Sequence, residues 1–324
     1  MQELIGFIEE NSDYFSFISV ALFSFFTSLP KDLNPLSAVA LMFQQIAEKV
    51  NREDRSDSYK RLASILSICL IYLPSILIIS QLYNVVFESA FLEMLLLFLL
   101  LSWHDKKASY LQIFDALKRN NYAQAKFQLA SLTQRNTKPL SLMGISKASI
   151  ESMVLQLTCS WFAVLFWYLV SGIYGAIFYR TVQLCAQQWN AKDPAFTALS
   201  RIPSFIYSVM LFPVHLIVSF TFALYDKPLQ NIPQKFKQSI AWHHFSSGLL
   251  LASFALSMQI ELGGVRLYQE NKVNYARLGY NKAPGVDKIE QSLQRLSLSA
   301  WFWLFCISGY HFAPLLLEFI TLSH

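Results

Sequence analysis

Two charged side chains in apolar surroundings are the groups of this sequence most able to do chemistry. Arg180 ends the apolar run SWFAVLFWYLVSGIYGAIFYR, and Glu93 lies inside ESAFLEMLLLFLLL. A charged side chain at the centre of a membrane helix costs roughly 2.5–3.5 kcal/mol, so it is usually kept for a partner or a pathway. A guanidinium can bind a carboxylate or phosphate through two parallel hydrogen bonds. Arg180 is therefore a candidate site residue, and Glu93 is expected either to pair with Arg180 or to be a capped carboxyl facing inward.

The other reactive residue types lack the spacing of a known site. The four cysteines share no CxxC spacing, and among the six histidines only His243 and His244 are adjacent. Neither pattern indicates zinc or a disulfide framework, so no metal site is predicted. His215, beside Pro213 in an apolar segment, is expected to be a buried hydrogen-bonding residue. No GxxxxGK[ST] or GxGxxG sequence occurs, so neither common phosphate-binding loop is present.

Composition predicts the elements that position these residues. Hydrophobic residues make up 54% of the 324 positions, charged residues make up 15%, and the mean hydropathy is +0.36. This is more apolar surface than one soluble core can hide, and the long apolar runs do not alternate as barrel strands do. We predict an all-α polytopic membrane protein with about 5–7 transmembrane helices and amphipathic cytoplasmic helices. Residues 1–324 are expected to form a single integral membrane domain. The predicted spans are residues 14–30, 62–83, 86–103, 152–171, 203–225 and 298–320.

The distribution of positive charge predicts the orientation. Of the 26 Lys and Arg residues, six fall in residues 31–61, eight in 104–150 and nine in 226–297. Cytoplasmic loops retain positive charge, so these three loops are expected to be cytoplasmic, helical and packed on the membrane domain, with both termini on the far side. The same bias accounts for the net charge of +5, and no nucleic-acid partner is predicted.

Whether the predicted orientation holds depends on how residues 172–187 lie relative to the membrane. If 152–171 and 172–187 both crossed the membrane, the nine-charge loop after residue 225 would be external, against the positive-inside rule. We therefore predict one crossing, followed by a segment through Arg180 that re-enters the membrane or lies on it. Gly172 and Gly175 are also common in ordinary membrane helices and do not decide the question.

Two of the loops carry helix signals of their own. Residues 35–50 follow Asn34, a helix N-cap residue type, and begin with Pro35, which is favoured at the first helical position. In residues 107–132 apolar side chains recur at intervals of three and four on both sides of Asn120-Asn121. This pattern predicts a helical hairpin packed on the membrane face or on the other loops.

The order of several segments resembles the CobD/CbiB family of cobalamin-biosynthesis membrane proteins over nearly the whole chain, and more distantly the AmpE proteins. The apolar run ending at Arg180 is similar to the family pattern VVAPLFWxxxGGxxGAxxYRAVN. Individually the motifs are weak, and their common order and spacing carry the resemblance. The other matching segments are NPLSAVALMFQQIAEKVNR, ALKRNNYAQAKFQLASLTQRNT, SKASIESMV, HHFSSGLLLASFALSMQIELGG and DKIEQSLQRL.

The resemblance implies a multi-pass protein of the bacterial inner (plasma) membrane that joins cobyric acid, or its adenosylated form, to aminopropanol or aminopropanol phosphate by an amide bond. Its partners would be the lipid bilayer, a corrinoid and aminopropanol (phosphate), with ATP and Mg as cofactors if the synthase activity is retained; a homo-oligomer is also compatible. Glu151 and Arg180 are the candidate catalytic residues. The candidate substrate-binding residues are Tyr179, Ser246, Ser247, Gly248, Gly263, Gly264 and Gly279.

Several polar residues of the family pattern are replaced. The pattern's acids and amides correspond here to Leu155, Gln156, Cys159, Gln183 and Ala186. Its KPxIGD becomes YARLGYN, which keeps the glycine and loses the Lys, Pro and Asp. Because Leu cannot coordinate Mg²⁺ or accept a proton, the resemblance supports the fold more than the chemistry. Two hypotheses follow: an amide synthase, or a non-catalytic AmpE-like sensor or regulatory protein on the same scaffold. A transporter would rest on the number of spans alone, without inverted repeats.

Overall fold

The computed structural model describes residues 11–30, 33–86, 89–225, 232–268 and 271–322. Parts of the predicted span 86–103 and of the predicted loops 31–61 and 226–297 lie outside them. The described chain is mostly helical, as predicted. Its α-helices are α2 (Ser12–Phe23), α3 (Pro35–Val50), α4 (Asp57–Val85), α5 (Ser89–Leu100), α6 (Trp103–Lys118), α7 (Tyr122–Ala130), α8 (Leu142–Leu157), α9 (Ala163–Gln188), α10 (Thr197–Leu224), α11 (Ile232–Ile240), α12 (Phe245–Ser257) and α13 (Asp287–Leu322). A π-helical turn η2 (Thr158–Phe162), a 3-10 turn η3 (Pro194–Phe196) and the strands β1 (Glu261–Tyr268) and β2 (Asn271–Gly279) complete the fold.

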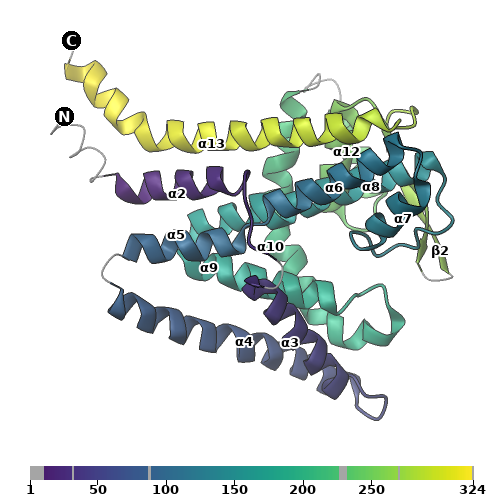
Figure 1. Cartoon of the computed structure of the whole chain (residues 1–324), viewed down its shortest axis with the longest axis horizontal. Coiled ribbons are helices and arrows are strands. Elements are labelled where there is room, and N and C mark those ends of the chain that lie inside the picture. Colours follow the sequence, from purple (N-terminus) through teal and green to yellow (C-terminus); the bar gives the residue numbers. More distant parts are fainter. Residues whose placement is uncertain (1–10, 31–32, 87–88, 226–231, 269–270, 323–324) are drawn as a thin grey trace.

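The two ends of the molecule carry different parts of the chain. The rings of Tyr14 in α2 and His311 in α13 stack with centroids 4.2 Å apart, so these two helices meet at one end (Figure 1). The connection between α3 and α4, helix α7 and strand β2 lie toward the opposite end (Figure 1). The predicted grouping of basic loops away from the termini agrees with this arrangement. Which end faces the cytoplasm stays a prediction.

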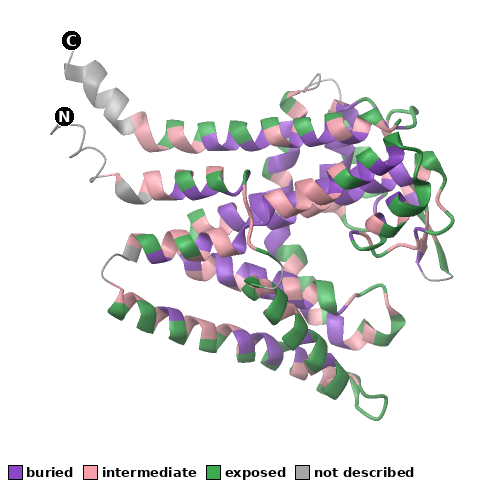
Figure 2. Ribbon diagram, in the orientation of Figure 1, coloured by how far each residue is buried: buried purple, intermediate pink, exposed green. Residues whose placement is uncertain are grey.

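Within the described residues, three helical stretches are long and apolar enough to cross a membrane: Asp57–Val85, Leu142–Gln188 and Pro194–Leu224. Each overlaps one predicted span, and the total of 5–7 spans stays a prediction. Large apolar side chains remain exposed along α4 and α10, including Leu70, Leu77, Phe205 and Phe220 (Figure 2). Water would disfavour so extended an apolar surface, whereas lipid would not.

The chain reverses direction inside α9. The Tyr179 hydroxyl donates a hydrogen bond to the Cys159 carbonyl at 2.7 Å, although twenty residues of straight helix would separate them by about 30 Å. The reversal is at Ser171 and Gly172, which are not helical; Gly172 has φ 63° and ψ −164°. Only glycine adopts such a conformation readily. The second half of α9 therefore runs back along the first; whether it crosses the membrane, re-enters it or lies on it stays a prediction.

Strands β1 and β2 form an antiparallel hairpin within 226–297, where the sequence predicts helices. Glu261 pairs with Gly279, and the register shifts between Gly263 and Gly264. Both of these glycines have positive φ, 80° and 94°. A bulge built on two adjacent glycines interrupts the alternation of apolar and polar residues that indicates a strand. This is why the sequence pattern did not predict the hairpin.

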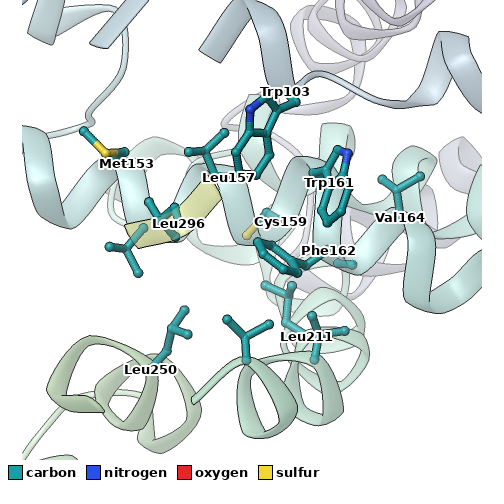
Figure 3. Packing of buried hydrophobic residues seen from close by; sticks show 14 of the residues in the cluster. Trp103, Met153, Leu157, Cys159, Trp161, Phe162, Val164, Leu211, Leu250 and Leu296 are labelled. Atoms are coloured by element: carbon teal, nitrogen blue, oxygen red, sulfur yellow. The ribbon is translucent and has the colours of Figure 1, made fainter. Parts of the chain in front are cut away.

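The core is centred on α8 and η2, most of whose side chains are buried. Trp161 packs against Trp103 and Phe162, with ring centroids 5.3 and 4.9 Å apart (Figure 3). The local helix signals are confirmed: Asn34 accepts a hydrogen bond from the Leu36 amide at 2.9 Å, and the break between α6 and α7 falls at the predicted asparagines. A core of this kind holds the polar residues of α8, Glu151 among them, in fixed positions.

Candidate functional site

Glu151 of α8 lies at the centre of a buried ionic cluster. Its side chain is 3% exposed, and Oε1 accepts a hydrogen bond from the Gly263 amide at 2.5 Å. Oε2 accepts one from Arg266 at 3.0 Å and lies 3.1 Å from a terminal nitrogen of Arg135. The loop before α8, α8 itself and the distant strand β1 therefore meet at one carboxylate, and both of its oxygens are engaged.

The glycine bulge permits this contact. A Cβ atom on Gly263 would lie 2.1 Å from the Ala276 carbonyl oxygen and 3.0 Å from the Trp242 ring. Real Cβ atoms do not approach other atoms so closely. The absent side chain lets the backbone of β1 fit between β2 and the indole, where its amide reaches Glu151.

Aromatic rings enclose the guanidinium of Arg266. Its central carbon lies 4.3 Å from the Tyr275 ring centroid and 4.9 Å from that of Trp242. Cation–π contacts of this kind strengthen when they are shielded from water. Although burial lowers the pKa of Arg266, Glu151 and Tyr268 raise it more, and the net shift is upward. Arg266 is therefore held as a fixed cation.

An exposed lysine and two histidines lie at the rim of this cluster. Lys192 donates a hydrogen bond to the Tyr268 hydroxyl at 3.0 Å, and the His243 ring lies 4.5 Å from that of Tyr275. Burial lowers the pKa of His244, and nearby Lys192 and His243 lower it further. The rim can meet an anionic ligand from solution. We use the name hairpin cluster for the ion pairs around Glu151 together with the hydrogen bond between Lys192 and Tyr268. Its residues are Arg135, Glu151, Lys192, Arg266 and Tyr268.

Tyr268 is expected to titrate unusually early. Burial alone would raise its pKa, but Lys192 and Arg266 lower it from the ordinary 10.0 to about 8. Because the folded-state pKa is the lower one, the stability gained is fully present above the ordinary tyrosine pKa and is lost as pH falls through about 8. Near-ultraviolet absorbance should show one tyrosinate forming near pH 8, absent in Tyr268→Phe. Lys192→Met should move the midpoint upward, and an unchanged midpoint would contradict this assignment.

Arg180 lies in a second polar cluster. Its two terminal nitrogens donate to the Gln183 amide oxygen at 2.6 Å and to the Ser102 hydroxyl at 2.8 Å. The residue is 6% exposed. Glu93 does not pair with Arg180 in the described structure, because the guanidinium contacts Gln183 and Ser102 and forms no ion pair with Glu93. Glu93 instead lines a cavity of about 10 Å³ together with Tyr168.

The chain reversal brings Tyr179 and Cys159 into the same region. Cys159 belongs to the π-helical turn η2, and its carbonyl accepts the Tyr179 hydroxyl hydrogen bond. π-Helical turns inside α-helices are rare and are frequent at functional sites. Tyr179 belongs to the stretch that is similar to the family's YR motif, and Cys159 stands where the family has an acid. The hydrogen bond therefore joins these two family-like stretches directly.

The two candidate serines have separate partners. The Ser246 hydroxyl lies 3.3 Å from Nδ1 of His215, which is buried as the sequence predicts. The Ser247 hydroxyl donates to the His244 carbonyl at 3.0 Å, a contact within the first turn of α12. Ser247 thus stabilises a helix start, and Ser246 is held by a histidine rather than by the hairpin cluster.

Two of the candidate glycines are sites of close packing. A Cβ atom on Gly248 would lie 2.6 Å from Cβ of Trp242. Gly279 has φ 83°, its amide donates to Gln238 at 2.8 Å, and an added Cβ would lie 2.1 Å from the Ile260 carbonyl oxygen. Both glycines shape the walls around the hairpin, and their role as direct substrate contacts stays a prediction.

The structure thus brings together some predicted site residues and separates others. Glu151 contacts Gly263, and Gly264 lies next to Lys147 at the same hairpin. Tyr179 and Arg180 contact a different set of side chains. Arg135 and Arg266 were missed as partners of Glu151. The available signals were weak: Arg135 lies in the family-like TQRNT, and Arg266 comes two residues after the glycine pair.

Comparisons with known proteins relate this chain to one family. The family model described as "CobD/Cbib protein" matches residues 18–296. A cobalamin biosynthesis protein CobD of Stutzerimonas stutzeri is 24% identical over 90% of this chain and 96% of its own length. One from Leptospira interrogans is 27% identical over 82% of this chain and 86% of its own length. No solved structure matches.

Proposed function

Because this chain belongs to the CobD/CbiB family of cobalamin biosynthesis proteins, we propose that it acts at the bacterial inner membrane in the step that joins (adenosyl)cobyric acid to aminopropanol or its phosphate. The observation that carries the proposal is the hairpin cluster. At its centre, Glu151 contacts Arg135 and the Gly263 amide, so that parts of three family-like segments meet at one carboxylate. Convergence of this kind is expected of a shared site.

Forming an amide from a carboxylate requires activation of the acid and correct placement of the amine. ATP would supply the leaving group that activates the acid, and Lys192 at the exposed rim fits a phosphate by charge and access. Arg180 would hold the carboxylate or phosphate of a substrate. Glu151 does not fit Mg²⁺, because both of its oxygens are already engaged by two arginines and an amide. In this arrangement Glu151 positions Arg266 and the hairpin rather than a metal.

A second candidate is a non-catalytic AmpE-like protein that binds a ligand or partner on the same scaffold. The observation favouring it is at Cys159, which stands where the family has an acid and interacts electrostatically with Arg180. A thiol can line a binding site, but it does not replace a carboxylate as a magnesium ligand or as a base at neutral pH.

Complementation separates the two candidates. In a bacterial strain lacking its own aminopropanol-attaching enzyme, the synthase proposal predicts growth without added cobinamide when this chain is present in the membrane. Arg180→Ala should abolish that growth, and Arg180→Lys should weaken it by about tenfold or more, since lysine lacks the planar fork of donors. No growth with the native chain present in the membrane would leave the non-catalytic candidate. Normal growth with both variants would remove Arg180 from the site.

A further inference from the structure

We propose that Arg180 binds a small oxyanion, a carboxylate or a phosphate group, in the interior where α9 folds back against η2, and that this anion supplies a counter-charge which the chain itself lacks. The inference rests on the proposed role of Arg180 as a substrate-binding residue. It adds the structural consequence: an occupied site stabilises the reversal of α9 and the start of α6.

The charge of Arg180 is uncompensated within the described residues. Its hydrogen-bond partners, Gln183 and Ser102, are both neutral, and no described carboxylate lies within ion-pairing distance of it. The acidic groups that interact with it electrostatically are the side chains of Tyr179, Tyr207 and Cys159. Ordinary phenols and thiols are protonated at neutral pH. A buried cation without a counter-charge is strongly disfavoured, so an anion that reaches it gains much more than at an exposed arginine.

A donor for that anion is already in place. The Nε atom of Arg180 is fully buried and has no hydrogen-bond partner. Ser102, which accepts from the guanidinium, is the N-cap of α6 and makes no capping bond with its own side chain. The guanidinium is thereby held at the positive end of a 16-residue helix, where unpaired amides also attract anions. The positive charge of the guanidinium and the positive end of α6 therefore lie at the same buried position.

The carboxylate nearest in sequence to this helix start is committed elsewhere. Asp105, in the first turn of α6, accepts a hydrogen bond from the Ser28 hydroxyl at 2.5 Å. It makes no ion pair with Arg180 in the described structure. Cys159 lies among the buried residues of η2 (Figure 3), and its side chain is near enough to interact electrostatically with Arg180. An acid placed at Cys159 would therefore be the internal equivalent of the proposed ligand.

The test measures anion-dependent stability of the full chain purified in mild detergent. Formate and inorganic phosphate are titrated separately at constant ionic strength against a bulky sulfonate. We expect a saturable rise in the melting temperature of the native chain, because a ligand that binds only the folded state stabilises it. The larger response to formate or to phosphate identifies the substrate group that occupies the site.

Three variants make the result specific. Arg180→Met should lose the response, and Cys159→Asp should be stable without added anion and respond at least tenfold more weakly. Cys159→Asn is the matched control of the same size without charge, and it should respond as the native chain does. No response in the native chain, or an equal response in Cys159→Asp and Cys159→Asn, would overturn the proposal. This test measures anion binding and needs no turnover, whereas complementation measures turnover. The anion can therefore bind in a chain that fails to restore growth, and growth can be restored by a chain that shows no anion response.

Discussion

Replacing Glu151 by glutamine should cost about 3–5 kcal/mol of folding free energy, because it leaves a buried ion-pair network with two cations and no anion. Arg135 and Arg266 are both largely buried, with side-chain exposures of 8% and 9%. Neither can turn toward water without opening the hairpin. Glutamine keeps the size of the side chain and one acceptor oxygen, so the loss reports the charge and not a cavity. Chemical denaturation in mild detergent measures it.

Asp57→Asn is the matched control. Asp57 faces Arg61 one turn along α4 at 4.0 Å, and the two side chains are 70% and 39% exposed. Exposed pairs of this geometry contribute about 0.3–0.5 kcal/mol, so the variant should unfold almost as the native chain does. Combining Glu151→Gln with Arg266→Met should recover part of the loss, because it removes one of the two unpaired cations. Equal losses for Glu151→Gln and Asp57→Asn would show that the buried cluster contributes no more than a surface pair.

The sequence predicts most of the helical part of this fold, because its signals are local. Asn34 and the pair Asn120-Asn121 act within a few residues of themselves, through side-chain capping and a tight turn. The reversal at Gly172 is different: its backbone conformation needs a glycine, but a glycine in an apolar segment does not by itself predict a reversal. The hairpin was missed because its strands are stabilised by distant helices, and its own alternation is broken by Gly263 and Gly264.

The candidate site is less predictable than the fold. Glu151 was identified because the segment around it resembles a family motif, but its partner Arg266 is 115 residues away. No local pattern records which distant cation a buried acid will meet. The mistaken pairing of Glu93 with Arg180 has the same origin: both lie in apolar segments, and no local pattern indicates that Arg180 contacts Ser102 and Gln183 instead. The retained motifs are thus better guides to backbone geometry than to charge pairing.

Alanine substitutions at Gly263 and Gly264 should distinguish the free-energy cost of backbone strain from the cost of close packing. Gly263 and Gly264 both have positive φ, but an added Cβ would lie 2.1 Å from a carbonyl oxygen at Gly263 and 3.8 Å from the flexible Lys147 ammonium at Gly264. Gly264→Ala should therefore cost about 1–2 kcal/mol, the strain of a left-handed residue. Gly263→Ala should cost about 3–5 kcal/mol, because the strand must move away from β2 and the amide loses Glu151.

Gly285→Ala is the control for this pair, since nothing lies within 4 Å of its added Cβ and its φ is not positive. It should leave the free energy of unfolding within about 0.5 kcal/mol of the native value. The displaced hairpin in Gly263→Ala should also detach Arg266 from the carboxylate, so this variant and Glu151→Gln should not be additive. If the two losses simply summed, or if Gly263→Ala cost no more than Gly264→Ala, the bulge would not be what holds the hairpin against α8.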